Sequence, residues 1–381
     1  MKATNYLSED YKVLTKFFPA GWRVKLRELN ALKRCRNIKS ANILIQILLI
    51  HLADGCSLRE TVARAKQAKL TSISDVALLK RLRSASQWFN WMSLALLKDI
   101  GVEILPPKWL KDYKVKTVDA SVITEPGSTG TDWRLHYSMN LYNLSCEDFK
   151  ITKPSVGESF LNFKIHKGDL IIGDRAYGRL KGINYVRTHH GDFISRYMNG
   201  VFSMEKDQEP FDILKECRTI NYGEVKDWFV DAYTKSDHPL RESIRLCVIK
   251  KSDEEAAKSV KKAQQQFIKK QRKINPETLE LHRYVILLTS LPKEISALQV
   301  LELYRYRWQV ELAFKRLKSI IGLGHLPKTD EESCKAWLHG KMFVALLAQA
   351  IVDEGRRFFP WGYPIGRNKF VERNSLCITF N

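Results

Sequence analysis

The hydrophobic period of the chain changes near residue 114, and this change limits the possible folds more than any other feature. Upstream, the stretch 41–53 is apolar on nearly every side, as a helix buried in a small bundle is. Downstream, the apolar residues alternate or form short runs, which is the pattern of β-strands. We predict strands and one helix at Val115–Val118, Arg134–Leu141, 169–174, Leu180–Thr188 (the helix) and Asp192–Tyr197. This order predicts an α/β fold, with a mixed sheet that follows an all-α region.

The charge of the chain indicates an anionic partner. Its 63 Lys and Arg residues outnumber 42 Asp and Glu residues, which gives a formal net charge of +21. A surplus of this size favours nucleic acid over anionic lipid. The longest apolar run, 43–53, falls well short of the roughly 20 residues that cross a bilayer, so we expect no membrane partner. The seven cysteines are scattered without a C-x-x-C pair, which argues against structural zinc and favours a cytoplasmic protein with reduced thiols.

The basic surplus is concentrated in the helical region. Residues 1–100 contain 18 basic and 7 acidic residues. Ser57 and Glu60 form the pattern of a capping box, which predicts a helix to about Lys66. Ser74 starts a second helix over 76–85, and this helix is basic. Its cations are Lys80, Arg81 and Arg83. Two short helices in this order fit a helix-turn-helix that reads a DNA groove, and they fit equally a basic bundle that contacts phosphates alone.

The remaining chain divides into a β-rich segment and two long helices. Strand-like pieces at 225–234, 243–249 and 284–289 surround a polar helical stretch at 254–274. The lysines of that stretch form either a solvated helix face or an arm that faces DNA. Long helices are expected at 296–321 and 331–356. We predict five parts: a helical DNA-binding region (1–110), a first core segment (111–198), a β-rich insertion (199–292), a second core segment (293–357) and an irregular tail (358–381).

A stripe of polar residues on the predicted helix over 296–321 contains candidate catalytic residues. At about 100° per residue, Tyr304, Arg307, Glu311 and Lys318 fall within a stripe roughly 60° wide. The stripe borders the apolar arc of the helix instead of opposing it. A surface ladder of ion pairs would give the same residues, at tenths of a kcal/mol per pair. The border position favours a carboxylate at the edge of a cleft.

Two further acids stand at the ends of apolar strands. Asp119 follows Val115–Val118, and Asp174 ends the apolar run that begins at Asp169. Three carboxylates in such positions can hold two Mg²⁺ or Mn²⁺ ions, which prefer hard oxygen ligands. Two such ions activate a water or a 3′-hydroxyl and stabilise the leaving oxygen in phosphoryl transfer. Neighbouring Arg and Lys side chains would hold the phosphates.

Three motifs resemble those of a known family. The spacing Tyr304-x2-Arg307-x3-Glu311-x6-Lys318, the run Gly173–Gly178 and the run Thr117–Ser121 together resemble the motifs of the insertion-sequence DDE transposases of family four. The motifs fall in the family's order, and the resemblance covers roughly residues 40 to 350. It implies a ribonuclease-H-like core in which a β-rich insertion separates Asp174 from Glu311.

The resemblance also implies an activity, ligands and partners. The activity is cut-and-paste DNA transposition, in which the enzyme binds terminal inverted repeats, cleaves both strands and inserts the freed ends into target DNA. Two Mg²⁺ (or Mn²⁺) ions would be held by Asp119, Asp174 and Glu311. Contacts to DNA phosphates would come from Tyr304, Arg307, Lys318 and Arg175. A synaptic homodimer on double-stranded DNA and a bacterial-type, nucleoid-associated cytoplasmic location are implied too.

Two other functions stay open. The first is a catalytically inactive, transposase-derived DNA-binding protein or inhibitor. Retention of all three acids and of the Tyr-Arg-Glu-Lys stripe speaks against it. The second is a ribonuclease-H-like nuclease that cleaves without strand transfer. A basic helical region and an insertion are more than cleavage alone requires.

Overall fold

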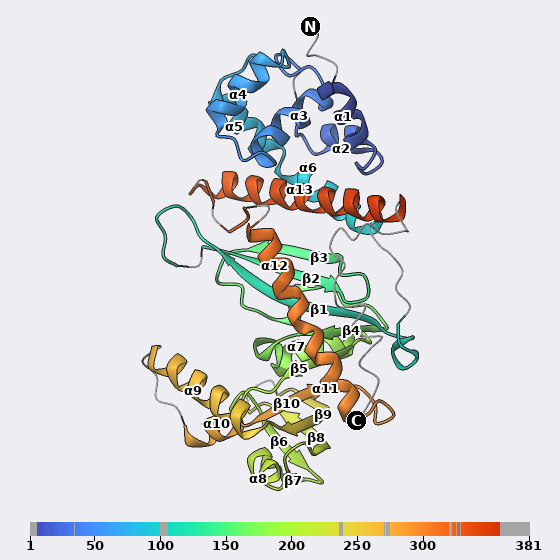
Figure 1. Ribbon diagram of the computed structural model, residues 1–381, viewed down its shortest axis with the longest axis vertical. Coiled ribbons are helices and arrows are strands. Elements are labelled where there is room, and N and C mark those ends of the chain that lie inside the picture. The colour runs from blue at the N-terminus through green and yellow to red at the C-terminus, as the bar shows by residue number, and fades with distance from the viewer. Residues whose placement is uncertain are drawn as a thin grey trace. The chain divides into compact units, whose positions relative to one another are not determined.

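The structure is a computed structural model that describes residues 6–358, apart from 34, 100–105, 131, 236–238, 270, 272–274, 320–321, 325 and 328. The chain divides into two compact units (Figure 1). The first unit combines Met1–Val102 with His339–Asn381, and the second unit is Glu103–Leu338. Helix α13 (Glu331–Phe358) begins in the second unit and ends in the first. Beyond Phe358, the predicted irregular tail lies outside the described residues.

The first unit is helical, as predicted. Its helices before α13 are α1 (Tyr6–Thr15), α2 (Trp22–Glu28), α3 (Ala41–Leu52), α4 (Leu58–Gln67), α5 (Asp75–Ser84) and α6 (Ser86–Asp99). An aromatic core joins α2, α6 and α13: the rings of Trp22 and Trp88 stack at 5.9 Å, and Phe89 packs on Phe343 at 5.6 Å. The predicted buried helix is α3, whose Leu44, Ile45, Ile47 and Leu48 are fully buried.

Helices α4 and α5 begin where the sequence predicts. The Ser57 side chain accepts a hydrogen bond from the amide of Glu60, and Ser74 caps α5 in the same way. The second half of the predicted capping box differs, because the Glu60 carboxylate accepts a hydrogen bond from Arg64 at 2.7 Å. One cap on each helix is enough to satisfy an amide that would otherwise lack a partner.

The second unit is built on one mixed sheet. Its strand order is β3-β2-β1-β4-β5-β10-β9-β8-β6-β7. The strands are β1 (Lys114–Ile123), β2 (Trp133–Asn140), β3 (Cys146–Thr152), β4 (Asp169–Ile172), β5 (Asp192–Arg196), β6 (Ser203–Lys206), β7 (Glu209–Pro210), β8 (Val225–Tyr233), β9 (Arg241–Lys250) and β10 (Tyr284–Thr289). Strand β4 pairs in parallel with β1 and β5, and the other pairs are antiparallel. The strands of 199–292 therefore extend the same sheet from β5 through β10.

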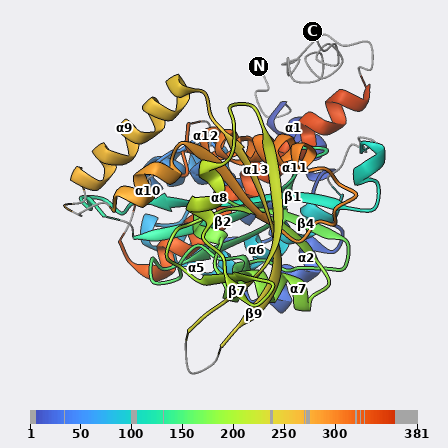
Figure 2. The same ribbon diagram turned by 90° about the horizontal axis from the view of Figure 1, so that it is seen from below.

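Helices cover both faces of this sheet. Strand β4 is buried on both sides: Ile171 packs with the core that includes α7 (Leu180–Thr188) and α8 (Ile213–Arg218), while Leu170 and Ile172 pack with the core under α11 (Ala297–Arg305). In Figure 1, α11 and α12 (Gln309–Ser319) cross the sheet in front. Figure 2 shows α9 (Asp253–Lys269) beside α10 (Pro276–Leu281). Within the described ranges, no helix is long and apolar enough to cross a bilayer.

The predicted single helix over 296–321 is wrong. It begins at the predicted place, because Ser296 and Gln299 form a complete capping box. It is then interrupted by a 3₁₀ turn, η4 (Tyr306–Trp308), before α12 begins. At this turn the carbonyl of Arg307 accepts a hydrogen bond from the Thr117 hydroxyl on β1 at 3.5 Å. The partner for that carbonyl comes from a strand 190 residues away, which helix periodicity does not reveal.

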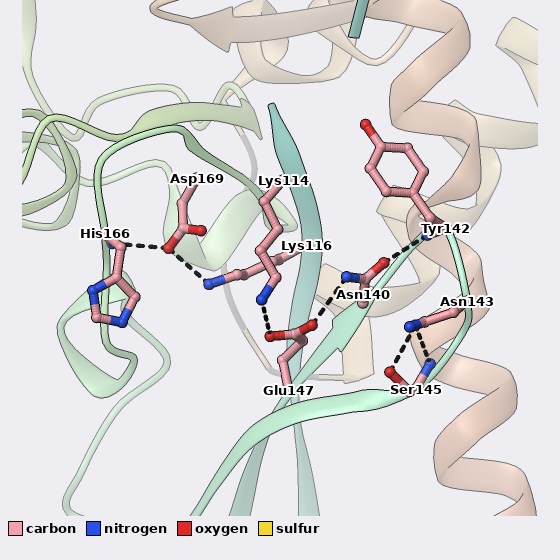
Figure 3. Close-up of polar contacts among 9 residues, drawn as sticks. All are labelled: Lys114, Lys116, Asn140, Tyr142, Asn143, Ser145, Glu147, His166 and Asp169. Atoms are coloured by element: carbon pink, nitrogen blue, oxygen red, sulfur yellow. Dashed lines mark hydrogen bonds and ion pairs between the residues drawn. The ribbon is translucent and has the colours of Figure 1, made fainter. Parts of the chain in front are cut away.

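A buried polar network aligns β1 with β4 (Figure 3). The Lys116 ammonium lies 2.7 Å from the Asp169 carboxylate, and both side chains are buried. The His166 amide donates to the same carboxylate oxygen at 2.8 Å. These contacts stabilise the parallel register in which Thr117 lies opposite Ile172.

Candidate active site

The register of β1 and β4 brings two predicted acids together. Asp119 and Asp174 each lie two residues beyond the paired residues Thr117 and Ile172. Because the strands are parallel, both acids lie level with the C-terminal end of β4. The prediction that Asp119 ends its own strand is wrong, because β1 continues to Ile123 through its pairing with β2. Each carboxylate is oriented by a nearby amide: Ala120 donates to Asp119 and Ala176 donates to Asp174, both at 2.8 Å.

The environment of Asp119 disfavours its charged form. Burial, together with the carboxylates of Asp174 and Glu158, raises the pKa of this carboxyl from 3.8 to about 7. The Ala120 amide and the Arg307 guanidinium act in the opposite direction but do not compensate. A carboxylate crowded in this way binds a cation readily, because a cation relieves both the burial and the repulsion.

Glu311 joins this pair through Arg307. Nη1 of Arg307 lies 3.8 Å from the Asp119 carboxylate, and Nη2 lies 2.5 Å from Oε1 of Glu311. The guanidinium thus stands between two of the three predicted ligands. We call Asp119, Asp174 and Glu311 the acid centre. As the side chains stand, no three His, Cys, Asp or Glu residues of the described chain are close enough to enclose a metal ion.

Tyr304 and Arg175, two of the predicted phosphate contacts, both lie within electrostatic range of Asp174. Burial raises the pKa of the Tyr304 phenol, and Arg307, Arg196, Asp174 and Arg175 all act on it electrostatically. Arg175 follows Asp174 in the short 3₁₀ turn η3 (Arg175–Tyr177). Its pKa is lowered by burial and by repulsion from Arg196, which exceeds the attraction of Asp174. The sequence prediction missed Arg196.

Gly178 permits this close approach of two arginines. A Cβ atom at Gly178 would lie 2.8 Å from the backbone carbonyl of Arg196, so a larger residue would push β5 away from η3. Arg196 itself is the last residue of β5. Its position at a strand end, like that of Asp174 just beyond β4, is the signal that could have identified it.

Lys251 adds a third cation from the β-rich segment. Burial, followed by repulsion from Arg196 and Arg175, lowers its pKa to about 8. Its Nζ donates to Oγ of Ser259 and to the carbonyl of His282, both at 2.8 Å. We call Arg175, Arg196 and Lys251 the cation cluster. Lys251 follows β9 in an unremarkable polar run, so nothing local in the sequence singles it out.

The remaining predicted contacts lie on α12 and α5. Lys318 is exposed and lines a hollow with Glu311, Phe314, Lys315 and Ser319. Lys318 and Glu311 therefore face the same hollow on α12. Lys80, Arg81 and Arg83 lie on α5 of the first unit, where Lys80 is exposed and the other two are partly buried.

A fourth acid was not predicted. Glu158 lies in the loop after β3, and its carboxylate is partly buried. Burial raises its pKa, with a further increase from Asp174. Glu158 lies 39 residues after Asp119 in the sequence and does not directly follow a strand, so no sequence pattern marks it as a site residue.

A mixed sheet with one acid on β1, a second just beyond the neighbouring parallel strand β4, a third on a helix and a cluster of arginines is the arrangement of the class of DDE-type transposases. The chain belongs to this family. Residues 145–347 match the family described as the transposase DDE domain, and the match includes Asp174 and Glu311. The resemblance of the three motifs to those of DDE-type transposases is thereby confirmed.

Curated relatives agree over most of the chain. The protein named InsL for insertion sequence element IS186A of Escherichia coli (strain K12) is 32% identical over 88% of this chain and 91% of its own length. The transposase for insertion sequence element IS421 of Escherichia coli is 32% identical over the same shares. The transposase for IS231F of Bacillus thuringiensis subsp. israelensis is 22% identical over 87% of this chain and 77% of its own.

Proposed function

We propose that the protein is a metal-dependent transposase that binds the terminal inverted repeats of an insertion sequence, cleaves them and transfers the freed strands to target DNA. The observation that carries this proposal is the placement of Asp119 and Asp174 by one strand register, with Arg307 between Asp119 and Glu311. An ion pair with Arg307 that was only structural would need one carboxylate and not a second one crowded beside it. A centre that binds divalent cations needs several carboxylates close together.

The donor set of the acid centre fits two Mg²⁺ or Mn²⁺ ions. All three residues offer carboxylate oxygens, the ligands that these hard cations prefer. A guanidinium already lies between two of them, at the kind of position that a cation takes. When bound, the metal pair lowers the pKa of a water or 3′-hydroxyl and stabilises the leaving oxygen. Asp119 and Asp174 would hold the ions from the sheet, and Glu311 would turn from Arg307 to complete the set.

The cations around the acid centre would hold the DNA backbone. Arg307, released by Glu311, can offer its fork of donors to a phosphate. Tyr304 and Arg175 would contact the same or the next phosphate, and Arg196 and Lys251 extend this surface toward β9. An anion here relieves the repulsion that lowers the pKa of Lys251. Lys318 would contact the strand farther along α12.

The order of the strands in the sheet supports the overall architecture that this proposal implies. The order β3-β2-β1-β4-β5, with β4 parallel to both its neighbours, supports a ribonuclease-H-like core, and β6 to β10 lie in the β-rich insertion. The predicted domains at 1–110, 111–198, 199–292 and 293–357 remain our division of the chain.

The basic helix α5 would contact the inverted repeats. A homodimer that pairs two ends, and a nucleoid-associated cytoplasmic location, belong to the same proposal.

Excision of a marked element tests the proposal. A marker between the two ends of the element is incubated with the full chain and Mg²⁺, and excision and joining are measured for wild type and for Asp119→Ala. Excision and joining by wild type alone support the proposal. End binding without excision in either protein would favour the inactive DNA-binding derivative. Cleavage without joining would favour the nuclease, and no end binding would refute end recognition.

A further inference from the structure

The loop that carries Glu158 is held in place by strand β2. Nη1 of Arg134 donates to the carbonyls of Pro154 and Val156, at 3.3 and 2.6 Å. Nδ2 of Asn162 donates to the carbonyl of Gly157 at 2.8 Å. Contacts on both sides of the loop restrict its conformation, so the position of Glu158 is determined by the core.

A buried histidine supports the same arrangement. Nδ2 of Asn162 lies 3.3 Å from Nδ1 of His136, and Nε2 of that ring lies 3.0 Å from the Thr152 hydroxyl. His136 is fully buried, and burial lowers its pKa to about 4. A neutral imidazole in a fixed position can accept from Asn162 on one nitrogen and donate to Thr152 on the other. The histidine thus positions the loop.

The residues after Glu158 pack directly against the residues after Asp174. Ser159 caps the 3₁₀ turn η2 (Phe160–Asn162). The ring of Phe160 packs on the ring of Tyr177 at 5.2 Å. A Cβ atom at Gly173 would lie 2.7 Å from Tyr177 and 3.0 Å from Phe160, so the two turns approach as closely as they can. This packing brings Glu158 to the side of Asp174.

Glu158 forms a long ion pair with Arg134 without a hydrogen bond. Its carboxylate lies 4.0 Å from Nε of Arg134, and that Nε has no hydrogen-bond partner in the described structure. Arg134 directs its Nη1 to the loop carbonyls instead. The Arg134 side chain therefore does not hold the Glu158 carboxylate by a hydrogen bond.

The Tyr177 hydroxyl supplies an independent observation. It is buried and finds no hydrogen-bond partner among the described residues, although a buried hydroxyl without one costs about 1–3 kcal/mol. Burial raises the pKa of this phenol, and the carboxylates of Asp119, Glu158 and Asp174 raise it further, against a smaller opposite effect of Arg134. A water bound to a cation among these carboxylates would give the hydroxyl its missing partner.

We propose that Glu158 is a fourth carboxylate ligand of the divalent-cation centre, with the Tyr177 hydroxyl accepting a hydrogen bond from a cation-bound water. Two divalent cations carry four positive charges, and the acid centre supplies three negative charges. Glu158 completes the balance before any phosphate arrives. Its side chain would rotate toward Asp174 to join the centre. This inference rests on the metal dependence in the proposed function.

Mn²⁺ binding to the full chain without DNA provides the test, with free Mn²⁺ measured by electron paramagnetic resonance. We expect Glu158→Gln to weaken Mn²⁺ binding about tenfold or more, and Glu158→Asp to restore part of it. Glu254→Gln is the matched control: this carboxylate pairs with Lys258 on α9 and is exposed, so binding should not change. Thermal unfolding establishes that each variant is folded.

Fe²⁺ in place of Mn²⁺ gives a positional readout. Hydroxyl radicals produced at bound Fe²⁺ cut the nearby backbone, so we expect cuts near 119, 174 and 157–159. Glu158→Gln should lose the cut at 157–159 and keep the others. Wild-type binding and cutting in Glu158→Gln, together with lost binding in Asp119→Asn, would overturn this inference and leave the proposed function intact. No Mn²⁺ binding by the wild type would overturn both.

Discussion

Replacing Asp119 by asparagine should stabilise the fold of the second unit while it removes a metal ligand. The reason is that the native carboxylate is buried beside Asp174 without sufficient compensation. Asparagine has nearly the same shape, and its carbonyl oxygen can keep the hydrogen bond from the Ala120 amide. It lacks the charge that makes the native residue unfavourable.

The magnitude follows from the pKa of the carboxyl. A rise from 3.8 to about 7 is roughly three units, and each unit corresponds to about 1.36 kcal/mol. The charged Asp119 side chain therefore costs at most about 4 kcal/mol of folding free energy at pH 8. The amide of the variant also needs a donor partner, so we expect a gain of about 2 to 4 kcal/mol.

The pH dependence has a definite sign. Between about pH 4 and pH 7, the folded state holds the Asp119 proton more tightly than the unfolded state. The contribution of this residue to wild-type stability therefore falls as the pH rises through that window. The advantage of the asparagine variant should be complete above pH 7 and should vanish near pH 4.

Urea unfolding at pH 8 in EDTA measures the effect, with amide hydrogen exchange of β1 and β4 reporting the second unit alone. Asp169→Asn is a control of opposite sign. Its carboxylate lies 2.7 Å from buried Lys116, so the same substitution leaves an uncompensated cation and should cost about 3–5 kcal/mol. Added Mg²⁺ should stabilise wild type, by about 2.7 kcal/mol at a hundredfold excess over Kd, and not Asp119→Asn. An asparagine variant that is less stable than wild type at pH 8 would refute the reasoning.

The remaining predictions concern other residues. Glu311→Gln should abolish strand cleavage and leave end binding nearly unchanged in a gel-shift assay; full cleavage would remove Glu311 from the acid centre. Neutralising Lys80, Arg81 and Arg83 together should weaken end binding and flatten its dependence on salt, and an unchanged salt slope would place the DNA contacts elsewhere. The stability advantage of wild type over His136→Gln should shrink as the pH falls from 6.5 to about 4, because the unfolded state then binds a proton that the buried imidazole does not. Parallel pH profiles of the two proteins would show that His136 does not titrate in this way.

Much of the secondary structure could be predicted from the sequence, because its signals are local. The strand Trp133–Asn140 is predicted from alternation, the strand Lys114–Ile123 is predicted only over its apolar run Val115–Val118, and Ser57 and Ser74 mark helix starts by their own side chains. The break in the helix over 296–321 could not be predicted in this way. Its residues are compatible with a continuous helix, and the carbonyl of Arg307 finds its partner on β1.

The candidate site, like the fold, could be predicted from the sequence only in part. The sequence by itself determined which acids follow apolar runs, the stripe that contains Tyr304 and Glu311, and the basic surplus, since each depends on spacing along one segment. Tertiary structure alone decided that Asp119 and Asp174 lie level with each other, because that depends on the β1–β4 register which the buried Lys116–Asp169 pair helps to hold. It also decided which residues from distant segments gather around them, namely Glu158, Arg196 and Lys251. Their positions depend on packing between segments far apart in the chain, and such packing leaves no periodic trace in the sequence.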